Sequence, residues 1–327
     1  MKENIKKIFF LLLAAGFFIV PCFLPAAGNH APGLAVISGI VFAVVWGNPF
    51  KEYTSKITPL LLGATIVGMG CGMDLIKVLQ AGANGILYTF IGICAGLGLG
   101  VLVGKRLKLN HDTMYLISVG TSICGGSAIA AAAPVLKAKA HDVAIASATV
   151  FALNAVALLV FPPVGHALGF TETQFGYWAA LAIHDTSSVV GAGFQYGPTA
   201  LEVGTTVKLA RALWIIPVTL FLSFFAAPAA EDGKRAVKFK VPWFIPGFLI
   251  AAAIVTWLPG LSEAGGVIKN ISKYLMVTTL FLIGANLSRE KLKELGLKPV
   301  LHGVILWIIL SAGWCTAIAT GLVNCKG

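Results

Sequence analysis

The chain has 327 residues, of which 57% are hydrophobic and only 11% are charged. Soluble domains carry about 25% charged residues, so this composition excludes a water-soluble protein and places most of the surface in lipid. The net charge of +11 would suit nucleic-acid binding, but the basic residues lie in short clusters between apolar runs. The sequence therefore predicts an all-α polytopic membrane protein that spans a lipid bilayer and binds no nucleic acid.

Apolar runs of about 20 residues are long enough to cross the hydrocarbon core as helices. The clear candidates are residues 8–24, 33–48, 57–72, 84–104, 141–161, 212–229, 242–258, 266–287 and 299–322. Two more stretches, 112–138 and 172–196, are apolar but interrupted by small and polar residues. We expect about 11 membrane segments, with these two broken and either re-entrant or crossed.

The distribution of basic residues predicts the orientation of the chain. Most of the 24 Lys and Arg fall in loops that share one side when the N-terminus is inside, which gives a cytoplasmic N-terminus and an outside C-terminus. Lys137 and Lys139 join the inside loops if 112–138 is a re-entrant hairpin, and lie outside if it crosses. The first run, 8–24, is an extra N-terminal span or part of a signal segment, residues 1–27, that is cleaved.

An internal similarity suggests inverted halves. Residues 70–77 resemble 284–291, and the charge distribution puts these two connectors on opposite sides of the membrane. The copies define halves of about 33–161 and 172–322, and inverted halves around a midplane site are typical of secondary transporters. Chance similarity between Gly- and Leu-rich segments is the alternative.

The first interrupted stretch has the features of an anion-binding segment. Gly125 and Gly126 end a helix at low cost, and Ser127 resembles the N-cap of an Ala-rich half-helix. A half-helix N-terminus at membrane depth presents free N–H groups and the positive end of the helix dipole. The hydroxyls of Thr121, Ser122 and Ser127 add further donors, so we predict substrate contacts here. A packing kink built from Gly and Ser is the alternative.

The second interrupted stretch carries an ionisable pair, His184-Asp185, in the middle of an apolar run. Ionisable residues inside a bilayer are costly and usually line a pathway or relay protons. We predict that the pair couples transport to a proton or Na⁺, and that Thr186, Ser187 and Ser188 contact substrate. Thr186-Ser187 also repeats the Thr-Ser pair of the first stretch. Alternatively, Asp185 only caps the following half-helix, and one residue can do both.

Three further polar residues are candidates that also have an ordinary structural explanation. Lys208 and Arg211 lie three residues apart on one helix face. They either attract an anion toward the site or snorkel to the membrane interface. Asn154 is a lone amide within a span, where an interhelical hydrogen bond is the commoner role.

Signatures of an enzyme are missing from the sequence. The segment around Ser127 does not fit the G-x-S-x-G elbow, and no phosphate-binding P-loop occurs, which excludes ATP drive within this chain. The six cysteines show no metal-binding spacing. We therefore expect no enzymatic activity, no metal site and no cofactor other than a coupling H⁺ or Na⁺.

Residues 120–131 and 184–192 resemble the signature stretches of the YeiH-type bacterial inner-membrane family, and 70–75 and 284–287 fit it as well. The resemblance covers nearly the whole chain. The family is largely uncharacterised, is often labelled as sulfate exporters, and is grouped with cation/proton antiporters and anion transporters. The resemblance implies a multi-pass protein of the bacterial inner membrane, with inverted repeats and discontinuous helices at the midplane, and it favours an anionic substrate.

Together these features predict one integral membrane transporter domain over residues 1–327. It would export a small anion, such as sulfate or a related sulfur oxyanion, by secondary transport coupled to protons or Na⁺. A passive anion channel would share the site but show flux indifferent to a cation gradient. A membrane accessory protein without flux is a third class, and a homo-oligomer is compatible with each of them.

Overall fold

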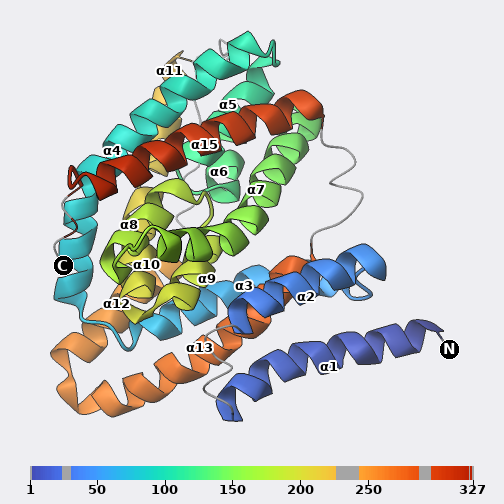
Figure 1. Cartoon of the computed structure of the whole chain (residues 1–327), viewed down its shortest axis with the longest axis vertical. Coiled ribbons are helices and arrows are strands. Elements are labelled where there is room, and N and C mark those ends of the chain that lie inside the picture. The colour runs from blue at the N-terminus through green and yellow to red at the C-terminus, as the bar shows by residue number, and fades with distance from the viewer. Residues whose placement is uncertain (1, 24–30, 226–242, 287–295, 324, 326–327) are drawn as a thin grey trace. The chain divides into compact units, whose positions relative to one another are not determined.

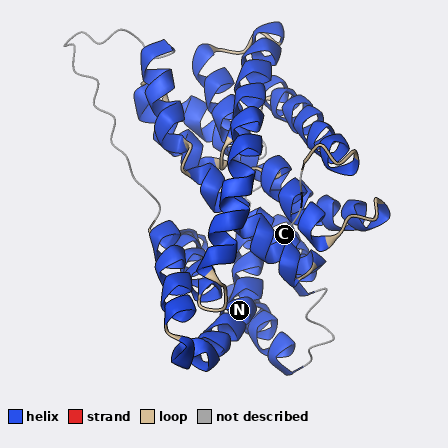
Figure 2. Cartoon of the chain, turned by 90° about the vertical axis from the view of Figure 1, so that its left-hand side faces the viewer, coloured by secondary structure: helices blue, strands red, loops and turns tan. Residues whose placement is uncertain are grey.

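The computed structural model describes residues 2–23, 31–225, 243–286, 296–323 and 325. Every regular element within these ranges is a helix, as Figure 2 shows. The chain divides into two compact units, each made of segments that are distant in sequence. Neither unit coincides with one of the halves expected from the sequence, and the inverted halves stay a prediction.

The first unit comprises Met1–Gln80, Phe194–Gly197 and Pro242–Glu290. Its helices are α1 (Lys2–Phe23), α2 (Ala31–Val45), α3 (Lys51–Gly70), α12 (Phe244–Trp257) and α13 (Ser262–Ala285), with a short 3₁₀ turn at Pro259–Leu261 (Figure 1).

The second unit comprises Ala81–Gly193, Pro198–Val241 and Lys291–Gly327. It contains most of α4 (Leu75–Arg106) and α9 (Thr186–Tyr196), and the whole of α5 (His111–Ser122), α6 (Gly126–Val135), α7 (Ala140–Ala167), α8 (Glu172–Ala182), α10 (Pro198–Ala212), α11 (Ile215–Phe225) and α15 (Leu297–Ala319).

The helices confirm a multi-pass membrane protein. The described stretches that are long and apolar enough to span a bilayer are Gly85–Arg106, Ala140–Ala167, Pro198–Phe224, Ser262–Ala285 and Leu297–Ala319, and shorter apolar helices accompany them. The total of about 11 segments stays a prediction. One expected boundary is wrong: the span placed at 212–229 begins at Pro198, because α10 and α11 form one apolar stretch. Lys208 and Arg211 therefore lie inside a span and not near its start.

In the first unit, α1 packs as a structural helix. Phe10 is 2% exposed, and its ring centroid lies 5.3 Å from that of Phe42 and 5.2 Å from that of Phe281. Asn286 follows α13, and its Oδ1 accepts from Thr54 Oγ1 at 2.6 Å. Of the repeat expected at 284–291, residues 287–291 lie outside the described residues.

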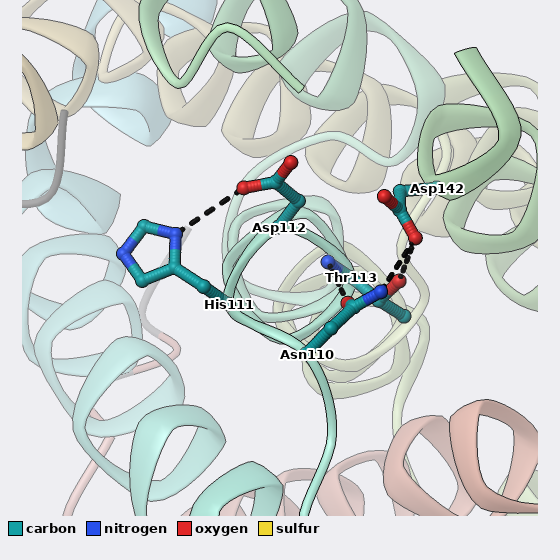
Figure 3. Close-up of polar contacts among 5 residues, drawn as sticks. All are labelled: Asn110, His111, Asp112, Thr113 and Asp142. Atoms are coloured by element: carbon teal, nitrogen blue, oxygen red, sulfur yellow. Dashed lines mark hydrogen bonds and ion pairs between the residues drawn. The ribbon is translucent and has the colours of Figure 1, made fainter. Parts of the chain in front are cut away.

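The first interrupted stretch folds as a hairpin of α5 and α6, separated by Ile123–Gly125. Asn110 caps α5 by accepting from the N–H of Thr113 at 2.8 Å, and its Nδ2 donates to Asp142 Oδ1 at 2.7 Å. Thr113 Oγ1 donates to the same carboxylate oxygen at 2.9 Å, as Figure 3 shows. Asp142 lies in the first turn of α7, so α5 and α7 begin side by side. The stretch is therefore re-entrant, because α6 must return to the end at which α5 started.

The second interrupted stretch is also re-entrant. A capping box of Thr171 and Gln174 starts α8, and the neighbouring Glu172 accepts at Oε2 from the N–H of Thr199 at 2.7 Å. Thr199 is in the first turn of α10, so α8 and α10 begin at the same end. The chain therefore returns to that end along α9. The first hairpin precedes the N-terminal end of α7 and the second follows its C-terminal end. The two hairpins thus enter the second unit from opposite ends of α7.

A row of glycines lets α4 approach the first hairpin closely. A Cβ on Gly96 or Gly100 would overlap the side chains of Ser122 and Ser118 on α5. His302 of α15 closes the other side, with its Nε2 2.8 Å from Gly100 O. The close packing of α4 thus positions the inner end of α5, which ends at Ser122.

Candidate functional site

The turns of the two hairpins lie against each other. A Cβ built on Gly125, in the first turn, would be 3.5 Å from the Cβ of Asp185 in the second. Asn154 lies near the middle of α7, and its Oδ1 accepts from the N–H groups of His184 at 3.2 Å and Asp185 at 3.3 Å. The two stretches that the sequence singled out therefore meet beside the middle of a membrane-spanning helix.

The first turn depends on a glycine. Gly125 precedes α6 with φ 68° and ψ −127°, and no side chain caps this helix end. The predicted N-cap at Ser127 is wrong, because the left-handed glycine turns the chain two residues earlier and α6 begins at Gly126. Ser127 is exposed on α6 and does not join the turn.

Gly125→Ala should destabilise the protein by about 1–3 kcal/mol, the usual cost of a strained backbone conformation. The nearest neighbours of the added methyl, at 3.4 and 3.5 Å, are in ordinary van der Waals contact, so the loss comes from the backbone. Thermal unfolding in detergent measures it. Gly98→Ala is the matched control, because a Cβ there meets nothing within 4 Å. Equal unfolding temperatures for the two variants would contradict this role of Gly125.

Arg211 joins the inner ends of α5 and α8. Its Nε and Nη2 donate to Ser122 O at 2.8 and 2.5 Å. Its Nη1 donates to Ala180 O at 3.0 Å and Leu181 O at 2.6 Å. These carbonyls belong to last turns of helices, where no intrahelical N–H is available. One guanidinium, 1% exposed, therefore satisfies the ends of both hairpins.

Lys208 supports the second turn in the same way. Its Nζ donates to Ile183 O at 2.6 Å and to Ala180 O at 3.3 Å. Cations are stabilising at helix C-termini because the helix dipole is negative there. Snorkelling does not fit either cation, since both side chains are buried. Within the described ranges, neither cation forms an ion pair with a carboxylate.

Asp185 caps α9, which is the structural role that the sequence allowed for it. Its Oδ2 accepts from the N–H of Ser187 at 3.1 Å and also from the Ser187 hydroxyl. Thr186, Ser187 and Ser188 are all buried in the first turn of α9. The repeated Thr-Ser pair is not a structural equivalence, because Thr121-Ser122 ends α5 whereas Thr186-Ser187 begins α9. A Thr-Ser pair can occur at either end of a helix, so the amino-acid sequence alone did not distinguish the two positions.

Several buried polar atoms around the turns have no hydrogen-bond partner among the described residues. They are Thr121 Oγ1, Asn154 Nδ2 and both ring nitrogens of His184. The Asn154 amide has a defined orientation, because its oxygen accepts from two backbone N–H groups and its Nδ2 must then be the free donor. Ser122 Oγ differs, since it donates to Ser118 O at 2.6 Å. Buried polar groups are normally satisfied, so this cluster is a candidate ligand site.

A family model described as conserved hypothetical protein 698 matches residues 9–303. The chain belongs to this family. A UPF0324 membrane protein of Bdellovibrio bacteriovorus is 52% identical, covering 99% of this chain and 97% of the relative. Relatives from Geobacter sulfurreducens (46% identical, 95% of each chain) and Bacteroides thetaiotaomicron (42% identical, 95% of this chain and 94% of the relative) carry the same description. The family resemblance drawn from the sequence is confirmed. The descriptions of these relatives name a membrane protein and no activity.

Among solved structures, the sodium proton antiporter MjNhaP1 from Methanocaldococcus jannaschii at pH 8 matches 99% of this chain and 100% of its own. The TM-score is 0.30 and the identity 12%. A likeness at this level does not establish a common fold.

Proposed function

We propose that the protein is a secondary-active transporter of a small anion, bound where the two hairpin turns meet and coupled to a proton or Na⁺ at Asp185. The observation that carries the proposal is the set of buried, unpartnered polar groups at the turns: Thr121 Oγ1, Asn154 Nδ2 and the His184 ring. The free Nδ2 of Asn154 can only donate, the Thr121 hydroxyl can donate, and a neutral imidazole provides one N–H. Oxyanions offer only acceptors, so they complement this set.

The start of α6 adds to this polarity. No side chain caps it, and the first N–H groups of a helix carry the positive end of the dipole. The predicted substrate contact at Gly126 would be made by this backbone, whereas the N–H of Gly125 already donates to Gly120 O at 2.9 Å. Thr186, Ser187 and Ser188 belong to the opposite turn, where Asp185 already accepts from Ser187.

The arrangement of the hairpins supports transport across a membrane. Two re-entrant hairpins that enter from opposite ends of α7 and meet near its middle support the proposal, because inverted arrangements around a midplane site are common in secondary transporters. With α5 and α7 starting together, Lys137 and Lys139 join the side of the basic 105–108 loop. This strengthens the predicted orientation, with a cytoplasmic N-terminus and an outside C-terminus in the inner membrane. The export direction, and sulfate or a related sulfur oxyanion as substrate, rest on the family resemblance alone.

The test is labelled-sulfate flux into proteoliposomes, with and without an imposed pH or Na⁺ gradient. We expect gradient-dependent accumulation that Asp185→Asn abolishes, because an amide can still cap α9 but takes up no cation. Asp112→Asn is the matched control, since that carboxylate lies in the first turn of α5, at the end away from the two hairpin turns, next to His111. Flux that ignores both gradients would indicate the passive channel. An absence of flux for sulfate and for a wider set of anions would contradict transport.

A further inference from the structure

The formal charges at the two turns do not balance. Lys208 and Arg211 are 0% and 1% exposed, and within the described ranges both donate to backbone carbonyls. Asp185 is the one carboxylate among the described residues of the two turns. With Lys208 and Arg211 both protonated, two buried cations against one carboxylate leave an excess of one positive charge when Asp185 is ionised.

Helix dipoles do not remove this excess. The inner C-termini of α5 and α8 contribute about half a negative charge each, and the inner N-termini of α6 and α9 contribute about half a positive charge each. These four contributions cancel, because each hairpin brings one helix end of each sign to its turn. The excess therefore persists at a depth where uncompensated charge is expensive.

We propose that the loaded site is electrically neutral: a divalent anion occupies it together with one monovalent cation, a proton or Na⁺, held by the Asp185 carboxylate. This rests on the proposed function and adds the charge and stoichiometry of what is bound. The two negative charges of a dianion offset the positive charges of Lys208 and Arg211 once Asp185 has bound a cation and become neutral. A monovalent anion is already balanced with Asp185 ionised, so its binding takes up no cation.

The unpartnered donors favour the divalent oxyanion. Asn154 Nδ2 carries two N–H groups, while His184, Thr121 and the uncapped start of α6 add further donors at the two turns. A set of several donors suits an anion with several acceptor oxygens. Because anion and cation each stabilise the site for the other, their binding affinities are linked reciprocally.

Other ionisable groups lie at the two turns and bear on which one takes the proton. His184 lies in the same turn as Asp185, Cys124 lies in the first turn, and Lys208 and Arg211 reach the helix ends there from α10. From α7 the neighbour is the neutral Asn154. His184 is the alternative acceptor, because both of its ring nitrogens lack a partner in the part of the chain that the structure describes.

The experiment is isothermal titration of the full-length, detergent-purified protein with sulfate, in Na⁺-free buffers of different ionisation enthalpy. We expect uptake of about one proton per sulfate, and an affinity that falls about tenfold for each unit of pH above neutrality. Asp185→Asn should bind sulfate without proton uptake and without this pH dependence, whereas Asp112→Asn should behave as the parent. Nitrate should bind the parent without proton uptake. If Na⁺ replaces the proton, sulfate binding should instead require one Na⁺.

Two results would overturn the inference while leaving an anion site in place. One is sulfate binding by the parent with neither proton uptake nor a Na⁺ requirement. The other is proton uptake that persists in Asp185→Asn, which would assign the proton to His184. Failure of every anion to bind would count against the proposed function itself. Should Asp185→Asn not fold, the contrast between sulfate and nitrate in the parent decides the question.

Discussion

Arg211→Ala should strongly destabilise the second unit of the protein. The guanidinium supplies the side-chain donors for Ser122 O and Leu181 O, at 2.5–2.8 Å and 2.6 Å. A buried carbonyl left without a donor costs about 1–3 kcal/mol, so two of them predict a loss of about 2–6 kcal/mol. Ala180 O retains a second donor, Lys208 Nζ at 3.3 Å. Thermal unfolding in detergent measures the effect.

Arg211→Lys separates charge from geometry. A lysine keeps the positive charge but lacks the planar fork that reaches α5 and α8 at once, so we expect an intermediate loss of stability. Arg106→Ala, on an exposed residue at the end of α4, controls for removal of an arginine in general. The role given to Arg211 is wrong if its alanine variant unfolds at the same temperature as the Arg106 variant.

Asn154→Asp should keep the acceptor that holds the second turn but weaken anion binding by about 10- to 150-fold or more, because the carboxylate also adds a negative charge beside the site. The aspartate has the same shape, and one oxygen can still accept from the N–H groups of His184 and Asp185. The other oxygen replaces the unpartnered Nδ2 and turns a donor into an acceptor. Hydrogen bonds to charged groups contribute about 1.5–3 kcal/mol, which sets the expected range. Sulfate titration and thermal unfolding are measured on the same sample.

Asn154→Ala completes this comparison. It removes both the acceptor that holds the second turn and the free donor, so both stability and anion affinity should fall. Asn154→Asp keeps the acceptor and adds a negative charge, so it should lower the affinity more than Asn154→Ala does. If the aspartate variant binds sulfate as tightly as the parent, Asn154 Nδ2 does not belong to the site, and its role is the interhelical hydrogen bond alone.

The positions of the two breaks were predictable from sequence because they depend on local chemistry. Gly125 and Gly126 interrupt a helix wherever they occur in one, and His184-Asp185 is anomalous in any apolar stretch. The exact helix start was not predictable to the residue. A serine before an Ala-rich run resembles an N-cap, but whether it is used depends on where the preceding glycine adopts a positive φ.

The course of the two broken stretches was decided by tertiary contacts. The positions of Lys137 and Lys139 favoured a hairpin over a crossing segment only weakly. The hairpins are instead shown by two hydrogen bonds, from Asn110 to Asp142 and from Thr199 to Glu172. These hydrogen bonds join residues about 30 positions apart, between helix ends whose pairing no local pattern encodes.

Sequence by itself determined the membrane class, the family and the two stretches on which the proposed function depends, because hydropathy and helix breaking are properties of short segments. Tertiary structure alone decided that Arg211 serves the inner ends of both hairpins and Lys208 that of the second, and that Asn154 leaves its Nδ2 without a partner among the described residues. Those roles arise from orphaned carbonyls and N–H groups of other helices. Such groups exist only once the hairpins have formed and their turns have met.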